Sequence, residues 1–380
     1  MAAKTVSKPP TSLAALREKM SKKYGEDRVT RRDKIEPYRV TSTGSLDLDM
    51  ALVVGGWVEG RIHEIVGQEG SSKTTLAITS MAAAQAKYPK LACGYIDMEH
   101  SFDWDWAEAN GLDTSDDRFM HVFPDDSEDV SDQIKEMMET GLFKMIVVDS
   151  IGGMESKQAF GKDAEEHVMG RNAQVITRMS KRLAVLARNH QCTVLLINQY
   201  RANLSSPQGG DQSAGPKALK YATSTKVEMR RAGGSDPLKV KFPWDENPQI
   251  VGIQFAGKVS RNKCAPAGRT GKYYLINQQT AEYGPVGIDQ ASEALAVGLL
   301  AGVIEQAGAY YSMPWTKDKK DRIKSRASVL EYLREHPERV AEVRDAAVAT
   351  MAHEVVPEQL IEFETDNGVE QVDPTTGEVR

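Results

Sequence analysis

The feature of this sequence that most constrains its fold is a glycine-rich segment, Gly67-Gln-Glu-Gly-Ser-Ser-Lys-Thr74, between an apolar run and a helical pattern. The apolar run, residues 61–67, is typical of a buried strand, and residues 73–88 are typical of a helix. A strand, a loop ending in Lys-Thr and a helix form a P-loop, in which backbone N–H groups at a helix N-terminus surround a phosphate. The sequence therefore predicts a nucleotide-binding α/β domain, and a chance glycine turn is the alternative.

The residues of this loop have distinct expected roles. Lys73 is expected to reach the β- and γ-phosphates, and the Thr74 hydroxyl is expected to bind Mg²⁺. Ser72 departs from the pattern, which has glycine before the lysine, and its Cβ would make a positive φ unfavourable there. The predicted cofactors are ATP and Mg²⁺, and the predicted contacts are Gly67, Gln68, Glu69, Gly70, Ser71, Ser72, Lys73, Thr74 and Thr75.

Two acidic residues follow other predicted strands. Residues 145–148 are apolar and run directly into Asp149, a Walker B pattern that predicts Asp149 beside Thr74 and the metal. Glu99 follows the predicted strand 91–98, and from there it could orient and deprotonate a water molecule near the γ-phosphate. Read alone, each acid could instead be an ordinary residue at a strand end.

The order of strands and helices predicts the architecture. Strands are expected at 61–67, 91–98, 145–151 and 192–200, and helices between them at 73–88, 104–112 and 172–190. This alternation favours a mostly parallel sheet with helices on both faces. Strands at 224–231, 250–261 and 271–277 would extend it in antiparallel fashion, and helical patterns at 292–306 and 326–356 indicate a small α-rich C-terminal domain.

The chain is predicted to have four parts. An N-terminal helix and linker occupy residues 1–40, and the helix at 11–24 carries Leu13, Leu16 and Met20 on one stripe. The α/β core occupies 41–284 and the helical domain 285–354.

The tail, 355–380, is acidic. Residues 354–380 carry eight acidic residues and one basic residue, Arg380, a local charge of −7, so the rest of the chain sums to about +1 of the total charge of −6. This uneven distribution of charge suggests that the rest of the chain binds a polyanion and that the acidic tail competes with it. The alternative is a solvated surface with a tail that only keeps the protein soluble.

Composition excludes other classes of protein. No stretch has the roughly 18 consecutive apolar residues of a membrane-spanning helix, and no apolar signal core is present near Met1. The three cysteines, Cys93, Cys192 and Cys264, are far apart, which excludes a disulfide framework and a zinc site. A cytoplasmic protein without a membrane partner is expected.

Eight segments occur in an order that resembles the bacterial RecA recombinase family. They are TSTGSLDLDMAL, GRIHEIVGQEGSSKTTLA, YIDMEHSFD, MIVVDSIGGM, LLINQYR, GPKALKYATS, GKVSRNKCAP and IEQAGAYYS. The resemblance covers residues 11–345, and several of these segments have no role in other P-loop proteins. Ser72 and the divergent loops depart from the family pattern, and these departures resemble those of a distant or phage-encoded member. The implied fold is α/β: a RecA-type P-loop ATPase core with a mostly parallel sheet, an N-terminal helix for polymerisation and a small α-rich C-terminal domain.

The resemblance also implies roles for particular residues. Glu99 matches the family's catalytic glutamate, and Gln199 matches the glutamine that senses the γ-phosphate. Asp103 and Trp106 fall where the family contacts adenine, with Trp106 in place of a tyrosine. Arg261 and Lys263 match two cations that reach the nucleotide of the neighbouring subunit; otherwise they would be ordinary cations at a strand end. The predicted catalytic set consists of Lys73, Glu99, Gln199, Arg261 and Lys263.

The family further implies two DNA-binding loops, at 158–170 and 199–217. The predicted DNA contacts are Met169, Gly170, Arg171, Arg201, Gly209, Gly210 and Lys217. The implied function is an ATP-dependent recombinase, a DNA-dependent ATPase that polymerises as a helical filament on single-stranded DNA and exchanges strands with double-stranded DNA. The alternatives are a ring-forming helicase of the same core fold and a non-hydrolysing DNA-binding scaffold with a P-loop spoiled by Ser72.

Overall fold

The structure, a computed structural model, describes residues 12–25, 37–125, 127–151, 165–202, 211–213 and 217–354. In some helices and strands, as at 165–176, 201–202, 211–213 and 217–218, it describes the course of the backbone only. The chain divides into two compact units, Met1–Arg39 and Val40–Arg380, and each is described by itself. The predicted tail, 355–380, lies outside the described residues.

The first unit contains the helix α1 (Leu13–Tyr24). Its N-terminus is capped by Ser12, whose side chain accepts a hydrogen bond from the backbone N–H of Ala15. No residue of α1 is buried, so none of the described residues of this unit covers its apolar stripe. The helix forms where the 3.6-residue period predicts it.

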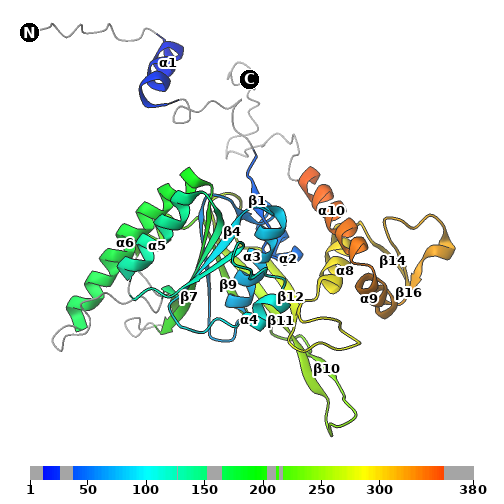
Figure 1. The fold of residues 1–380 in the computed structure, drawn as a ribbon. Coiled ribbons are helices and arrows are strands. Elements are labelled where there is room, and N and C mark those ends of the chain that lie inside the picture. Colours follow the sequence, from blue (N-terminus) through cyan, green and yellow to red (C-terminus); the bar gives the residue numbers. More distant parts are fainter. Residues whose placement is uncertain are drawn as a thin grey trace, which may run out of the picture. The chain divides into compact units, whose positions relative to one another are not determined.

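A large sheet is the centre of the second unit (Figure 1). Its strand order is β13-β12-β11-β9-β3-β7-β6-β4-β5, with β10 beside β11 and β8 beside β7. The strands from β9 to β5 are parallel, whereas β11, β12 and β13 extend the sheet in antiparallel fashion. The strands are β3 (Ile62–Gly67), β4 (Ala92–Asp97), β5 (Phe119–Val122), β6 (Phe143–Asp149), β7 (Thr193–Ala202), β8 (Asp211–Ser213), β9 (Thr225–Arg231), β10 (Leu238–Val240), β11 (Gln249–Asn262), β12 (Thr270–Ile276) and β13 (Gly287–Ile288), and a separate pair joins β1 (Val40–Thr41) to β2 (Trp57–Val58).

Helices cover both faces of this sheet, because successive side chains of a strand point to opposite faces. In β6, Met145 and Val147 pack with α3 (Lys73–Lys87), whereas Ile146 and Val148 pack with α5 (Ser127–Thr140) and α6 (Glu165–His190). Figure 1 shows α5 and α6 together on one side and α3 on the other. The remaining helices of the core are α2 (Leu46–Ala51), α4 (Trp104–Ala109) and α7 (Lys217–Ala222).

The C-terminal part combines helices with a small sheet, which the helical patterns do not predict. The elements are α8 (Gln290–Leu300), β14 (Glu305–Ala307), β15 (Tyr310–Ser312), β16 (Ile323–Lys324), α9 (Arg326–Glu335) and α10 (Pro337–Glu354). The predicted helix 292–306 is wrong after Leu300, where a turn with Gly302 at positive φ leads into β14. The predicted helix 326–356 is two helices, because Pro337 cannot donate a backbone hydrogen bond and starts a new helix.

The mixed α/β fold class is confirmed by this architecture. The strand β5 and the helix α5 were not predicted, although both belong to the parallel half of the sheet. The division between core and C-terminal domain at residue 284 stays a prediction. Among the helices of the described ranges, none is long and apolar enough to cross a membrane.

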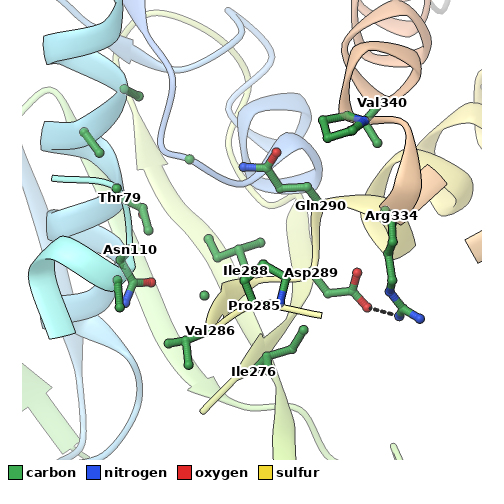
Figure 2. A pocket seen from close by; sticks show the side chains of 18 of the residues that line it. Thr79, Asn110, Ile276, Pro285, Val286, Ile288, Asp289, Gln290, Arg334 and Val340 are labelled. Carbon is green, nitrogen blue, oxygen red and sulfur yellow. Dashed lines mark hydrogen bonds and ion pairs between the residues drawn. The ribbon is translucent and has the colours of Figure 1, made fainter. Parts of the chain in front are cut away.

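A cavity of about 540 Å³ lies between the core and the C-terminal part. Its walls come from α3 and the end of α4 on one side and from the β13–α8 segment, α9 and α10 on the other (Figure 2). Asp289 and Arg334 form an ion pair of 2.9 Å on its wall. Of the described residues that line this cavity, none belongs to the predicted nucleotide or DNA contacts.

Candidate nucleotide-binding site

The glycine-rich loop links the end of β3 to the start of α3. Gly70 has a φ of 66°, and Ser72, directly before the helix, has a φ of 68° and a ψ of 24°. Both residues are therefore in the left-handed region, which glycine adopts readily and serine does not. Ser72, which stands where the motif has glycine, therefore has the unfavourable positive φ that the sequence analysis associates with its Cβ.

Lys73 lies over this loop, where its Nζ donates a 2.8 Å hydrogen bond to the backbone carbonyl of Gln68. The Ser71 hydroxyl donates to the same carbonyl over 2.6 Å. Burial lowers the pKa of Lys73, and the negative charges of Asp149, Glu99 and Glu69 oppose that shift. A buried ammonium beside a loop of backbone N–H groups fits a phosphate chain.

Thr74 and Asp149 form the candidate metal site. The Thr74 hydroxyl donates to Asp149 Oδ2 over 2.8 Å, and the Tyr95 hydroxyl donates to the same oxygen over 2.7 Å. Burial raises the pKa of Asp149, and the two hydroxyl groups oppose that rise. A hydroxyl and a carboxylate are oxygen ligands that suit Mg²⁺, so these residues fit the metal that accompanies a nucleotide.

Glu99 lies beside the same site and is held by two side chains. Its Oε1 accepts a 2.9 Å hydrogen bond from Gln199 Nε2 and a short one from the Ser150 hydroxyl. Asp97 orders the backbone around it by accepting from the N–H groups of Glu99, Ser101 and Phe102 over 3.0, 3.1 and 3.2 Å. The carboxylate that the sequence assigns to water activation is therefore linked directly to Gln199.

The register of the sheet explains why these residues meet. Gly67 lies opposite Gln199 in the β3–β7 pair, and Asp97 lies opposite Asp149 in the β4–β6 pair. The carboxyl ends of parallel strands share one edge, which is the usual position of a ligand site in such sheets. Four segments that are far apart in the sequence therefore converge on the phosphate loop.

The candidate adenine contacts lie at the start of α4. Asp103 caps this helix, because its Oδ1 accepts from the backbone N–H of Trp106 over 2.9 Å. The indole Nε1 of Trp106 donates to the Thr75 hydroxyl in α3 over 3.2 Å. This contact joins Trp106 to the helix that starts at the P-loop.

Arg261 and Lys263 lie elsewhere in the chain. Arg261 pairs with Lys226 at the start of β9, which is parallel to β3, so it lies at the opposite edge from the P-loop. It donates to the Thr223 hydroxyl over 2.8 Å, and Lys263 donates a short hydrogen bond to the carbonyl of Tyr221. Burial lowers the pKa of Lys263, and the charges of Arg261 and Arg61 lower it further. Within one chain these two cations do not belong to the phosphate site.

The predicted DNA contacts fall mostly where the structure describes the backbone alone or nothing. Met169, Gly170 and Arg171 belong to α6, so residues 165–170 of the predicted first loop are helical. Arg201 lies in β7 and Lys217 begins α7, and part of the predicted second loop forms β8, in which Ser213 pairs with Tyr200. Gly209 and Gly210 lie outside the described residues.

Three residues of the site were not predicted: Tyr95, Asp97 and Ser150. Tyr95 and Asp97 both lie on the predicted strand that leads to Glu99, and Ser150 directly follows Asp149. Their proximity to predicted strand ends is the only sequence signal for them, and it is weak without the register. Within the described part of the chain, no cluster of three or more His, Cys, Asp or Glu side chains could hold a further metal ion.

The strand–loop–helix unit and the acids beside it define an α/β protein of the P-loop class. A family model described as the RecA N-terminal domain matches residues 11–280, and this shows that the chain belongs to the RecA family. It is 29% identical over 347 residues to Protein RecA of Bordetella petrii, with 89% of each chain covered. It is 29% identical over 358 residues to Protein RecA of Acinetobacter baylyi, with 93% of each covered, and 31% identical over 307 residues to that of Paracoccus denitrificans, covering 80% of this chain and 79% of the relative.

Proposed function

We propose that this chain is a DNA-dependent ATPase that polymerises on single-stranded DNA and exchanges strands with duplex DNA. Membership of the RecA family supports recombination in general. The observation that carries the finer proposal is the 2.9 Å hydrogen bond from Gln199 to Glu99. It joins the candidate water-activating carboxylate to the strand that leads into the predicted second DNA-binding loop.

The residues divide the chemistry between them. When bound, Mg²⁺ would neutralise charge on the β- and γ-phosphates of ATP. Thr74 and Asp149 would hold the metal, Lys73 and the loop N–H groups would hold the phosphates, and Glu99 would accept a proton from the attacking water. Because Gln199 bonds to Glu99, a shift of β7 on DNA binding would reorient the base. This supports hydrolysis that depends on DNA.

The apolar stripe of α1, formed by Leu13, Leu16 and Met20, is an argument for the proposed filament. Leu13, Leu16 and Met20 are 62%, 39% and 41% exposed within their unit. A helix of this kind can cover its apolar side by docking on the next subunit, and a head-to-tail contact that does not close generates a helical filament. The opposite placement of the P-loop and Arg261 also suits a site shared between successive subunits.

ATP hydrolysis measured with and without single-stranded DNA tests this proposal, together with electron microscopy of the complex formed with a non-hydrolysable ATP analogue. We expect hydrolysis that requires DNA and a continuous helical filament on the single strand. Closed rings would favour a helicase, and filaments without hydrolysis would favour a scaffold. Either outcome would contradict the proposal.

A further inference from the structure

The serine at the end of the phosphate loop is used differently from the other serines that precede helices in this chain. Ser12 and Ser45 lie in the extended region, Ser325 has a φ of 77° and a ψ of 148°, and each of the three accepts a hydrogen bond from the first turn of its helix. Ser72 precedes α3 in the same position, but its φ is 68° and its side chain makes no bond to the helix. Its hydroxyl is therefore directed elsewhere.

That hydroxyl contacts a tyrosine on a distant strand. Ser72 Oγ lies 3.1 Å from the hydroxyl of Tyr273 on β12, and the two groups are 201 residues apart in the sequence. Tyr273 is 2% exposed and packs in the core with Phe255 on the neighbouring strand β11. A buried tyrosine hydroxyl needs a hydrogen-bond partner, and Ser72 supplies one.

We propose that Tyr273 is a positioning residue for the nucleotide site, because its hydroxyl holds Ser72 in the left-handed conformation and away from the N-terminus of α3. The inference rests on the proposed nucleotide binding at this loop. Glycine would adopt this backbone conformation without help, whereas serine needs an anchor to offset its cost. The Ser72–Tyr273 bond is that anchor.

The anchor has a second effect on the binding site. If Ser72 relaxed to the extended region, its hydroxyl could accept from the backbone N–H groups of Thr74 or Thr75, as an ordinary N-cap does. The same N–H groups are those that a P-loop offers to phosphate. Tyr273 therefore prevents the loop from satisfying its own donors, and it leaves them free for an anion.

Four consecutive residues of the loop, Ser71 to Thr74, then have three different attachments. Ser71 and Lys73 bond within the loop to the carbonyl of Gln68, Ser72 bonds to β12, and Thr74 bonds to Asp149 at the end of β6. The loop is thus held from inside and from both sides of β3. Removing one external attachment should change the affinity for phosphate rather than the fold of the core.

A double-mutant cycle tests this inference by isothermal titration with Mg²⁺ and ADP. Tyr273→Phe should weaken ADP binding about fivefold, the value of one hydrogen bond. In the Ser72→Gly background, Tyr273→Phe should not change the ADP affinity, because glycine needs no anchor. Tyr274→Phe is the matched control, since its hydroxyl contacts only the carbonyl of Asp236 among the contacts described for it, over 3.4 Å.

Two outcomes would overturn the inference: unchanged ADP affinity in Tyr273→Phe, or an equal loss in the presence and absence of Ser72→Gly. The second would mean that Tyr273 acts on general stability. If Tyr273→Phe does not fold, Ser72→Ala decides, because it keeps the Cβ and lacks the anchor. It should bind ADP more weakly than both the parent and Ser72→Gly, and equal binding would refute the anchor. A parent that binds no ADP contradicts the proposed function instead.

Discussion

Glu99 is the residue on which the proposed chemistry depends most directly. Its Oε1 accepts hydrogen bonds from Ser150 and Gln199, so the carboxylate has a fixed orientation beside the phosphate loop. Lys73 lies close enough for the charge of Glu99 to raise its pKa. A carboxylate that is fixed near Lys73, the residue expected to bind the phosphates, is suited to accept a proton from a water molecule there.

Glu99→Gln should abolish turnover while nucleotide binding is kept. The amide has nearly the same size and can still accept from Gln199, but it cannot take a proton, so hydrolysis should fall by about 100-fold or more. Phosphate release and ADP affinity measured on the same preparation check this expectation. Asp116→Asn, which changes an exposed acid, is the control and should hydrolyse ATP like the parent. Hydrolysis near the parent rate in Glu99→Gln would remove this residue from the proposed role.

The sequence predicts the residues with proposed chemical roles at this site better than it predicts the residues that position them. Lys73, Thr74, Asp149 and Glu99 follow from a motif or a strand end, whereas Gln199 follows from the resemblance to the RecA family. The structure brings the five together. The hydrogen-bond partners that position these residues cannot be predicted in the same way. A contact such as that between Ser72 and Tyr273 depends on how strands about 200 residues apart are arranged in the sheet. No local pattern encodes such a contact.

At the scale of elements, a buried carboxyl group joins the C-terminal part to the core. Glu293 in α8 accepts from the Ser45 hydroxyl and, over 3.2 and 3.4 Å, from the backbone N–H groups of Leu46 and Asp47 at the start of α2. Burial raises the pKa of Glu293 from its ordinary 4.5 to about 8, although these donors oppose the rise. The interface therefore prefers the protonated form.

This preference predicts a pH dependence of stability. Between pH 4.5 and about 8 the folded chain holds a proton on Glu293 that the unfolded chain releases, so the free energy of unfolding should be highest at the acid end and fall as the pH rises through about 8. Urea unfolding across this range measures the slope, which Glu293→Gln should flatten. Glu305→Gln, which changes an exposed acid in β14, should keep it. An unchanged slope in Glu293→Gln would assign the pH dependence to other groups.

The elements themselves were predictable where the hydrophobic period is strong. The parallel strands 61–67, 145–151 and 192–200 follow from short segments rich in apolar residues, since both of their faces are buried. The strand β5 was missed because Met120 is 46% exposed and the run is short. The break between α9 and α10 was missed because the apolar period continues across Pro337, although proline favours a boundary there.

At the scale of the whole molecule, assembly should depend on the apolar stripe of α1. Leu16→Glu places a charge in the middle of that stripe and should raise the protein concentration needed for assembly on single-stranded DNA about tenfold, which corresponds to one buried contact. Light scattering during titration of the protein onto DNA measures that concentration. Ala15→Glu adds the same charge on the other side of the helix and should assemble like the parent. Equal defects in the two variants would show that charge alone is responsible.

Head-to-tail assembly would also bring the two edges of the sheet together. Arg261 and Lys263 lie at the amino ends of the parallel strands, and the P-loop lies at their carboxyl ends. One chain therefore cannot supply both to one nucleotide, whereas successive chains in the proposed filament could. A cation from the neighbour would stabilise charge at the γ-phosphate in the transition state, as an arginine finger does.

Mixing two inactive variants should therefore restore hydrolysis. Arg261→Ala has an intact P-loop and Lys73→Ala has an intact Arg261, so random assembly of equal amounts would repair about a quarter of the junctions in a head-to-tail filament. Phosphate release across mixing ratios should show a maximum near equal amounts. Arg261→Ala mixed with the double variant Lys73→Ala, Arg261→Ala is the control, in which no junction has both parts. If co-assembly is verified by electron microscopy of labelled subunits and no ratio restores hydrolysis, Arg261 does not act across the subunit interface.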